Sequence, residues 1–322
     1  MATVTRTPSS SRIDALAKDL LESFDQVFGL HSGFRPVHAK GLMCSGTFTP
    51  TAEAKKLTRA PHVARASTPV IARLSDFAGI PSVPDNHLMH ASPRGMAIRF
   101  YLAEHVHTDL IGHSIDSFPV RTGEEFLEFN RAIAASGPDA PKPSPVERFV
   151  ASHPKAMQFV TAPKPIPTSF ARESFFPVSA FELIDQAGAS RFGRFRIRPE
   201  LGGEYLSDEE AAKKSPNFLF DELSARLASG PVKYRIYLQL AEPGDETSDA
   251  TVRWPESRRE VEFGAVTLTQ RDNELDPAIR KIIFDPIPRV DGLLPSNDPL
   301  FEIRAALYLL SGRRRRAATQ SK

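Results

Sequence analysis

Hydrophobic residues return to one side of a helical wheel near the start of the chain. Six apolar side chains between Ile13 and Phe28 follow this spacing until Gly29 interrupts it. Ser11 precedes them and is a typical residue for the beginning of a helix. The pattern predicts an amphipathic helix over 11–28 that packs one face against the body of the protein.

Alternation of apolar and polar positions then marks strands in two groups. The strand-like segments are 70–75, 95–103, 194–200, 233–240 and 260–270. In the third segment, Phe195 and Ile197 alternate with arginines, which is typical of a strand with one face in water. Strands in two groups, separated by a helix over 124–135 and long loops, predict an α+β fold built on an antiparallel barrel or sandwich with added helices.

Composition narrows the class of protein. The 322 residues are 41% hydrophobic, and their formal net charge of +2 argues against a general nucleic-acid-binding surface. Residues 1–10 are polar, and we expect them to form a flexible tail. Because no internal repeat or domain boundary is apparent, we expect a single domain over 11–322. The chain has no apolar run long enough to span a membrane and no apolar segment typical of a signal peptide. Its single cysteine, Cys44, is interpreted as a packing residue and suits the reducing cytoplasm.

The last helical segment carries a chemically unusual stripe. Arg304, Tyr308 and Arg315 fall within about 40° of one another on a helical wheel. A guanidinium group favours the ionised form of a neighbouring phenol, and tyrosinate is a known ligand of haem iron. Taken alone, the segment also fits a surface helix whose arginines at 313–316 are solvated.

Four earlier motifs add candidate site residues. "RPVHAKG" places Arg35 three residues before His38, and "TPVIARLS" places Arg73 two residues before Ser75 in a strand. A buried arginine among apolar neighbours requires an anionic partner. "PRGMAIRFY" is a turn leading into a strand, and "DLIGHS" carries His113. The histidine pairs in "HLMH" and "HVH" lack the cysteine or acidic residues that would complete a metal site.

In this order, the motifs resemble those of the haem catalase family. "DATVRWPE" resembles the family's Trp-Pro element, and "IIFDP" its short strand before the iron-ligand helix. The matching motifs cover about residues 30–315, and the sequence stops soon after the last of them, as in the small catalase-related peroxidases. The resemblance implies a catalase-type barrel with haem b buried between the barrel and the C-terminal helix.

The resemblance also implies roles for individual residues. His38 corresponds to the distal acid–base histidine and Ser75 to the serine that orients it. Tyr308 corresponds to the iron ligand and Arg304 to the arginine that keeps it ionised. Three arginines would hold the haem propionates: Arg35, Arg73 and Arg315. Three further residues would line the distal side: Val37, Phe126 and Phe129.

Three positions depart from the family pattern. Ala306 and Leu310 replace a phenylalanine and an aspartate on the ligand helix, and His113 replaces the distal asparagine. Because that asparagine helps to place the second peroxide of a catalase cycle, His113 predicts a peroxidase with weak catalase activity.

The expected reaction is reduction of hydrogen peroxide or organic hydroperoxides with a small organic electron donor. The first alternative is rearrangement of a lipid hydroperoxide, as in allene oxide synthases. The second is a haem carrier or sensor without enzymatic activity. The sequence leaves a homodimer open as the assembly.

Overall fold

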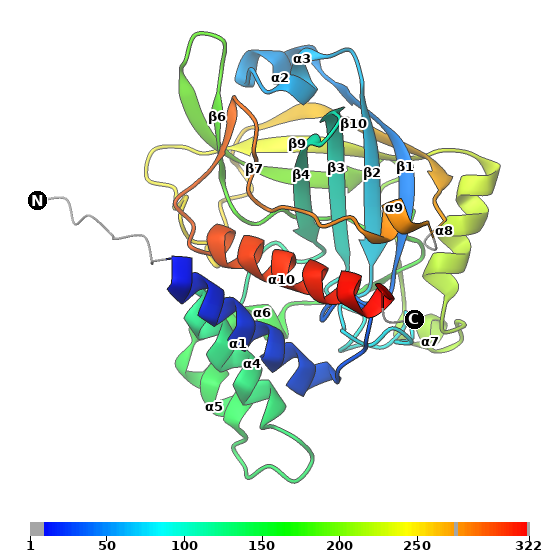
Figure 1. Cartoon of the computed structure of the whole chain (residues 1–322), viewed down its shortest axis with the longest axis vertical. Coiled ribbons are helices and arrows are strands. Elements are labelled where there is room, and N and C mark those ends of the chain that lie inside the picture. The colour runs from blue at the N-terminus through cyan, green and yellow to red at the C-terminus, as the bar shows by residue number, and fades with distance from the viewer. Residues whose placement is uncertain (1–9, 274–275, 321–322) are drawn as a thin grey trace, which may run out of the picture.

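The computed structural model describes residues 10–273 and 276–320, so most of the predicted tail lies outside the described residues. An antiparallel sheet of nine strands forms its centre, in the order β11-β6-β7-β9-β10-β1-β2-β3-β4 (Figure 1). The strands are β1 (Gly41–Pro50), β2 (Thr68–Ser75), β3 (Gly95–Ala103), β4 (Val106–His113), β6 (Phe181–Ile184), β7 (Ser190–Pro199), β9 (Val232–Leu240), β10 (Glu260–Arg271) and β11 (Leu293–Pro295). A separate two-stranded sheet pairs β5 (Ile166–Pro167) with β8 (Tyr205–Leu206).

The sheet curls and closes through a short bridging segment. Phe176 pairs with His113 at the end of β4, and the adjacent Phe175 pairs with Ile197 of β7. The apolar side chains of the enclosed face form the main core, which includes Phe48, Leu74, Ile98, Phe195 and Leu238. Burial of side chains of this size stabilises the fold by about 1.5–3 kcal/mol each. Of the barrel and the sandwich that the strand pattern left open, the structure has the barrel, as the family resemblance implied.

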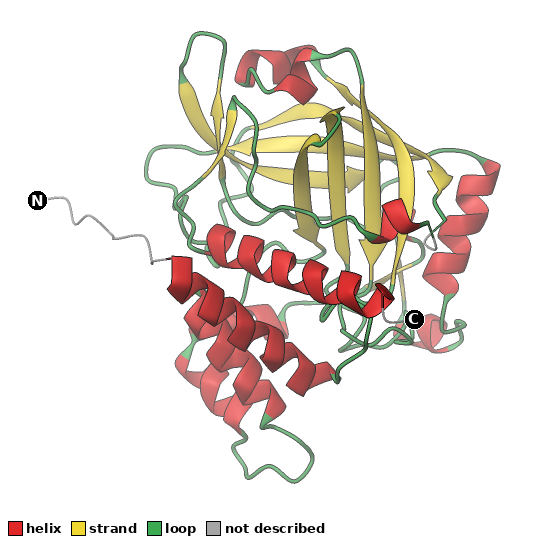
Figure 2. Ribbon diagram, viewed as in Figure 1, coloured by secondary structure: helices red, strands yellow, loops and turns green. Residues whose placement is uncertain are grey.

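Helices cover the outside of this barrel (Figure 2). They are α1 (Ser10–Phe28), α2 (Ala52–Leu57), α3 (Pro61–Ala64), α4 (Gly123–Ala134), α5 (Pro145–Ser152), α6 (Pro154–Thr161), α7 (Asp208–Ala212), α8 (Phe218–Ser229), α9 (Pro277–Arg280) and α10 (Leu300–Gln320), with a 3₁₀ turn at Phe170–Arg172. Helix α10 lies beside α1, and α1 packs on α4. Among the described residues, no helix is both long and apolar enough to cross a lipid bilayer.

The three helices α1, α4 and α10 share one apolar cluster. It contains Leu20 and Phe24 from α1, Leu127 from α4, and Ile303 and Leu307 from α10. The α1 helix ends where the sequence predicted, because Gly29 adopts a left-handed φ of 82° and its N–H donates to the carbonyl of Asp25 at 2.9 Å. Its beginning differs, since Ser11 lies inside the helix and not before it.

The face of β7 that was predicted to be wet is buried at two of its three arginines, and Arg198 is exposed. Arg194 and Arg196 are only 1% and 3% exposed. The Arg194 guanidinium lies 4.5 Å from the ring centre of Trp254 and donates to the carbonyl oxygen of Val252, while Arg196 pairs with Asp116 at 3.0 Å. The alternation marked the strand correctly, but a covering loop supplies polar partners that the strand pattern does not reveal.

The segment 282–286 also differs from expectation, because it belongs to no strand. Arg99 of β3 holds Asp109 of β4 through two hydrogen bonds of 2.9 and 2.7 Å and donates to the carbonyl of Ile283. The Asp109 carboxylate also accepts the N–H of Asp285 at 2.7 Å. These side-chain contacts fix the segment against the outside of the barrel without a strand ladder, and β11 is the short strand that precedes α10.

Candidate functional site

One row of residues across the sheet organises the site. Gly41, Ser75, Gly95 and His113 lie opposite one another on β1, β2, β3 and β4. Directly paired residues in an antiparallel sheet point to the same face, so Ser75 and His113 share the outer face with Gly95 between them. A Cβ atom at Gly95 would lie 2.8 Å from the His38 ring and 2.9 Å from Ser75 Oγ. The absence of a side chain there gives the His38 ring its place.

His38 is held in a defined tautomer. Its Nδ1 lies 2.9 Å from the carbonyl oxygen of Asp76 and 3.1 Å from Ser75 Oγ. A carbonyl oxygen only accepts, so Nδ1 carries the hydrogen and Nε2 keeps its lone pair. Burial lowers the pKa of His38 to about 3, and the cation of Arg73 contributes to this. The ring is therefore a neutral proton acceptor at physiological pH.

His113 has the opposite tautomer. Its Nδ1 accepts a hydrogen bond from the backbone N–H of Ile115 at 3.3 Å, so Nε2 carries the hydrogen of the neutral ring. Burial lowers the pKa of His113 to about 3, assisted by the cation of Arg304. Nε2 is buried without a hydrogen-bond partner among the described residues. The site thus contains one buried histidine that accepts at Nε2 and another that donates there.

Aromatic rings enclose this end of the site. The Phe118 ring centre lies 6.2 Å from that of His113 and 5.2 Å from that of Phe126. Val37 and Phe126 both pack against the apolar cluster that α1, α4 and α10 share. Phe129 does not reach His113 through these contacts; it packs against Phe149 in a neighbouring cluster.

Arg73 lies two residues before Ser75 on β2 and therefore points to the same outer face. It lies opposite Met43 and Ala97, and it is 6% exposed. A Cβ atom at Gly41 would lie 2.2 Å from Arg73 Nη2, so the glycine provides space for the guanidinium. One of its hydrogen bonds goes to the carbonyl of Ala39 at 3.2 Å. Arg73 is therefore positioned between the His38 loop and the sheet.

The other two arginines converge on a single carbonyl group. Arg35 Nη2 and Arg315 Nη2 lie 3.4 and 3.2 Å from the carbonyl oxygen of Ile282. Burial lowers the pKa of Arg315 to about 10, and the nearby Arg316 adds to this. Arg315 is buried while Arg314 pairs with Asp25 of α1 at 2.5 and 3.0 Å, so the basic run is only partly solvated.

Tyr308 faces the barrel from α10. It packs in an apolar cluster with Met43 and Ile71 of the outer sheet face. The guanidinium carbon of Arg304 lies 5.8 Å from its ring centre, one helical turn away. Ala306 and Leu310, the two departures on this helix, contribute to the separate cluster around α1. Helix α10 thus presents Tyr308 toward the sheet, and Ala306 and Leu310 toward α1.

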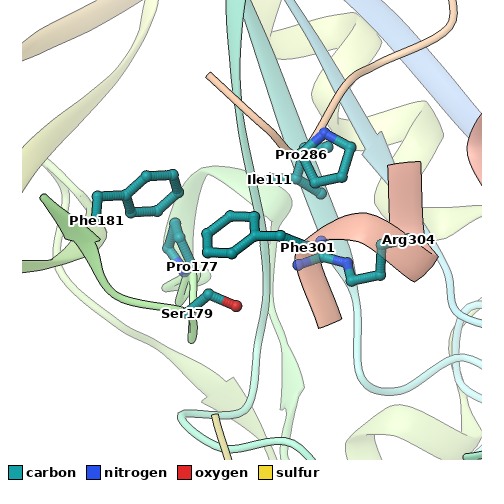
Figure 3. Close-up of a pocket in the computed structure, with 7 residues that line it drawn as sticks. All are labelled: Ile111, Pro177, Ser179, Phe181, Pro286, Phe301 and Arg304. Atoms are coloured by element: carbon teal, nitrogen blue, oxygen red, sulfur yellow. The ribbon is translucent and has the colours of Figure 1, made fainter. Parts of the chain in front are cut away.

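A small cavity adjoins Arg304 (Figure 3). Its lining combines the first turn of α10 with the end of the barrel: Ile111, Pro177, Ser179, Phe181, Pro286, Phe301 and Arg304. Ile111 lies in the same row as Arg73, so the cavity opens on the site's face of the sheet.

These residues fit an iron porphyrin. A porphyrin has two apolar faces, two carboxylates and an axial position on the metal. The cluster of Met43, Ile71 and Tyr308 offers apolar contact and a phenol oxygen, and the three predicted propionate arginines lie around it. The unpartnered Nε2 of His113 is a buried polar atom that a bound ligand would satisfy.

Sequence reasoning missed the backbone and glycine contributions to this site. Gly95, Gly41 and the Asp76 carbonyl position His38 and Arg73, and they became visible only through strand register. The available sequence signal was that the motifs "RPVHAKG" and "PRGMAIRFY" contain these two glycines. His87 and His90 stack at 4.4 Å, and no group of three or more metal-binding side chains forms within residues 10–273 and 276–320.

Known proteins match this chain over most of its length. The family model described as catalase matches residues 22–321. A catalase-related peroxidase from Synechococcus elongatus is 34% identical over 91% of this chain and 86% of its own length. Another from Mycolicibacterium paratuberculosis is 34% identical over 88% of this chain and 89% of its own.

Solved structures agree in fold. A fungal catalase superposes with a TM-score of 0.79 at 20% identity, covering 91% of this chain. This chain spans 61% of that catalase, and the similarity supports the fold alone. Together with the family match over nearly the whole sequence, these findings show that the chain belongs to the catalase family.

Proposed function

We propose that the protein is a haem b peroxidase that reduces hydrogen peroxide or an organic hydroperoxide with electrons from a small organic donor. The observation that carries the proposal is the complementary pair of Nε2 atoms on His38 and His113. One is a proton acceptor and the other a hydrogen-bond donor, both in a buried site. A hydroperoxide can use both functions, because the acceptor takes its proton while the donor holds it by a hydrogen bond.

Residues of α10 and the outer sheet face would hold the cofactor. Tyr308 would provide a phenolate oxygen as ligand to the iron, and Arg304 would stabilise its negative charge. Arg35, Arg73 and Arg315 would pair with the propionates, since guanidinium groups bind carboxylates strongly. When bound, the haem iron supplies the electron transfer that cleaves the oxygen–oxygen bond.

The chain's own groups manage the protons. His38 Nε2 accepts the proton of the peroxide oxygen and returns it to the leaving oxygen, which departs as water or an alcohol. His113 Nε2–H donates a hydrogen bond to the peroxide and holds it for this transfer. Val37, Phe118 and Phe126 exclude water. The overall reaction consumes one hydroperoxide, two protons and two electrons from the donor.

The position of His113 favours donor oxidation over oxygen release. An imidazole supplies one N–H at this place, whereas the family's asparagine supplies an amide with both a donor and an acceptor. Cys44 is buried, and a chain with one cysteine forms no internal disulfide, which suits a reducing compartment, so we place this activity in the cytoplasm.

The test compares two products at the same peroxide concentration. The cofactor of the purified protein is first identified as haem b by its absorption spectrum after extraction into pyridine. Donor oxidation and oxygen evolution are then measured in parallel, and we expect donor oxidation to exceed oxygen release clearly. Oxygen evolution at the level of a large catalase, with the donor hardly oxidised, would contradict the proposal. A hydroperoxide rearrangement would consume substrate without donor.

A further inference from the structure

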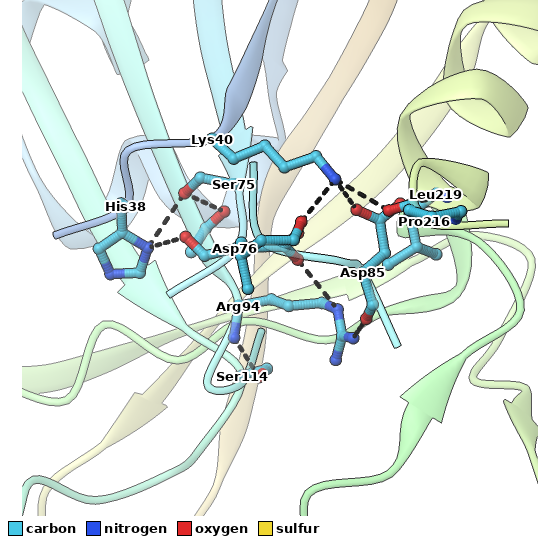
Figure 4. Close-up of polar contacts among 11 residues, drawn as sticks. His38, Lys40, Ser75, Asp76, Asp85, Arg94, Ser114, Pro216 and Leu219 are labelled. Atoms are coloured by element: carbon cyan, nitrogen blue, oxygen red, sulfur yellow. Dashed lines mark hydrogen bonds and ion pairs between the residues drawn. The ribbon is translucent and has the colours of Figure 1, made fainter. Parts of the chain in front are cut away.

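Four charged side chains form a buried group behind His38 (Figure 4). Asp76, Asp85 and Arg94 are fully buried, and the Lys40 side chain is 12% exposed. Lys40 Nζ lies 2.5 Å from Asp85 Oδ1, and Arg94 Nε lies 3.7 Å from Asp76 Oδ1. We call Lys40, Asp76, Asp85 and Arg94 the tetrad. Buried charges at this density are retained only where paired charges compensate for their lost hydration.

The tetrad lies where two segments of the site meet. The His38 N–H donates to the Phe77 carbonyl at 2.6 Å, and the Asp76 N–H donates to the Lys40 carbonyl at 3.2 Å. Lys40 and Asp76 therefore connect the segment that carries His38 to the segment whose carbonyl holds its ring. His38 itself has a left-handed φ of 55°. A non-glycine residue persists in that conformation only where surrounding contacts fix it.

The tetrad is anchored to α8. Asp85 Oδ2 accepts the backbone N–H of Leu219 at 2.7 Å, in the first turn of that helix. Lys40 Nζ donates to the carbonyl of Pro216 at 3.0 Å and also to that of Val83 at 2.8 Å. The Lys40 cation also lies 5.0 Å from the centre of the Phe220 ring. These contacts connect the loop that carries His38 to α8.

Arg94 completes the connection to β4. Its Nη2 donates to the Asp85 carbonyl at 2.7 Å, and its backbone N–H donates to Ser114 Oγ at 2.9 Å, beside His113. Burial raises the pKa of Asp76 well above its ordinary value, although the Arg94 cation opposes the shift. Lys40 and Arg94 are the two cations that face Asp76 and Asp85, so removing Lys40 disturbs the whole group.

We propose that the tetrad is the positioning unit of His38. It fixes the left-handed backbone of that residue and keeps the Asp76 carbonyl within reach of Nδ1, so that Nε2 retains its lone pair. This inference rests on the proposed role of His38 as the proton acceptor. The tetrad does not contact the peroxide; it acts through the geometry of the imidazole.

The experiment replaces Lys40 by methionine in the haem-loaded enzyme. Two rates are measured against pH, the reaction with peroxide and the association of hydrogen cyanide, which also loses a proton on binding. We expect both rates to fall by about tenfold to 10²-fold, because small misplacements of a catalytic group have effects of this size. Haem content should remain that of the wild type. Lys40→Arg should restore most of both rates, since it keeps the charge and several donors.

The pH profile separates positioning from general destabilisation. The charged or titratable groups that act on His38 are Arg73, His113 and Arg35, and none of them is altered by the substitution. If the ring is released toward water, the pKa of His38 rises, and the acid loss of both rates moves to higher pH. A purely structural role would lower the melting temperature without moving this limb.

Lys164→Met is the matched control. Like Lys40, Lys164 has an Nζ that donates to backbone carbonyls, three in this case, and lies 6.0 Å from a phenylalanine ring centre; it follows the end of α6. Both rates should be unchanged in this variant. Wild-type rates and pH limb in haem-loaded Lys40→Met would overturn the proposal.

A second variant tests the proposal if Lys40→Met does not fold. Asp85→Asn removes the opposing charge at nearly constant size, and unchanged rates there would equally overturn the proposal. If the wild type oxidises no donor, the proposed function fails, while cyanide association still tests the tetrad.

Discussion

The two sides of the site are built in different ways. On α10, Arg304, Tyr308 and Arg315 come from one helical stripe, and the helix alone sets their relation. On the opposite side, His38 comes from a loop and His113 from the end of β4. These two histidines become neighbours only through the register of the intervening strands.

This difference separates two kinds of function. The helix side presents a phenol and cations, which require only an approximate direction to hold an iron porphyrin. The histidine side requires defined tautomers, and each tautomer depends on one backbone group: the Asp76 carbonyl for His38 and the Ile115 N–H for His113. Changes on α10 should therefore affect cofactor retention, and changes at the histidines should affect rates.

The largest effect is expected for Tyr308→Phe. A phenyl ring offers no ligand oxygen, so the variant should lose most of its haem and, with it, most of its reaction with peroxide. The ratio of haem absorbance to protein absorbance measures this directly. Tyr237→Phe, on β9 and outside the site, is the control and should retain full haem. Full haem with an unchanged spectrum in Tyr308→Phe would remove the tyrosine from the proximal position.

His38→Ala should retain haem and lose rate. Positioned proton transfer contributes roughly 10²- to 10⁴-fold, and the reaction of peroxide with the haem-loaded variant should slow by that factor. His113 cannot replace the lost base, because its Nδ1 already accepts the Ile115 N–H and its Nε2 carries a hydrogen. Rapid mixing with peroxide gives the rate. Equal rates in the variant and the wild type would contradict the assignment of the proton acceptor.

Substitutions at His113 should have smaller and more selective effects. His113→Phe removes the N–H donor, and we expect about tenfold slower reaction with peroxide, the size of one lost hydrogen bond. His113→Asn restores a donor, so its rate should approach that of the wild type while oxygen release rises relative to donor oxidation. Both products are measured at one peroxide concentration. An identical product ratio in wild type and His113→Asn would show that this position does not control the balance.

The features that the sequence predicted are those set by local periodicity, and the features it did not predict depend on residues distant in sequence. The strand at 95–103 and the Arg304–Tyr308–Arg315 stripe were readable because local periodicity determines them. The burial of Arg194 and the irregular course of 282–286 were not, since each depends on partners distant in sequence. The tautomers of His38 and His113 were equally inaccessible, because backbone groups set them. Family resemblance named both positions without revealing that one accepts and the other donates.

The smallest expected effect concerns the pH dependence of stability, to which the histidine side of the site contributes through its buried, neutral rings. Burial lowers the pKa of both His38 and His113 to about 3, and of His62 inside the barrel to about 4. The unfolded chain, with histidine pKa values near 6.5, therefore binds more protons between pH 3 and pH 6.5. Stability from these groups is fully present above pH 6.5 and is lost as the pH falls toward 3. Glu173 acts in the opposite direction, because burial raises its pKa to about 7.

Replacing one of these histidines should flatten the pH dependence of unfolding. Each buried neutral histidine contributes up to about 1.4 kcal/mol per pH unit to the slope of unfolding free energy against pH within that window. His113→Asn removes one such group, so its slope between pH 6 and 4.5 (about the middle of the window) should be shallower than that of the wild type. His105→Asn, at a side chain that is 92% exposed, should leave the slope unchanged. Denaturant unfolding of the haem-loaded proteins at several pH values gives the comparison. Parallel curves for wild type and His113→Asn would mean that His113 does not enter the folded state as a buried, neutral donor, and the contrast between the two sides of the site would then rest on His38 alone.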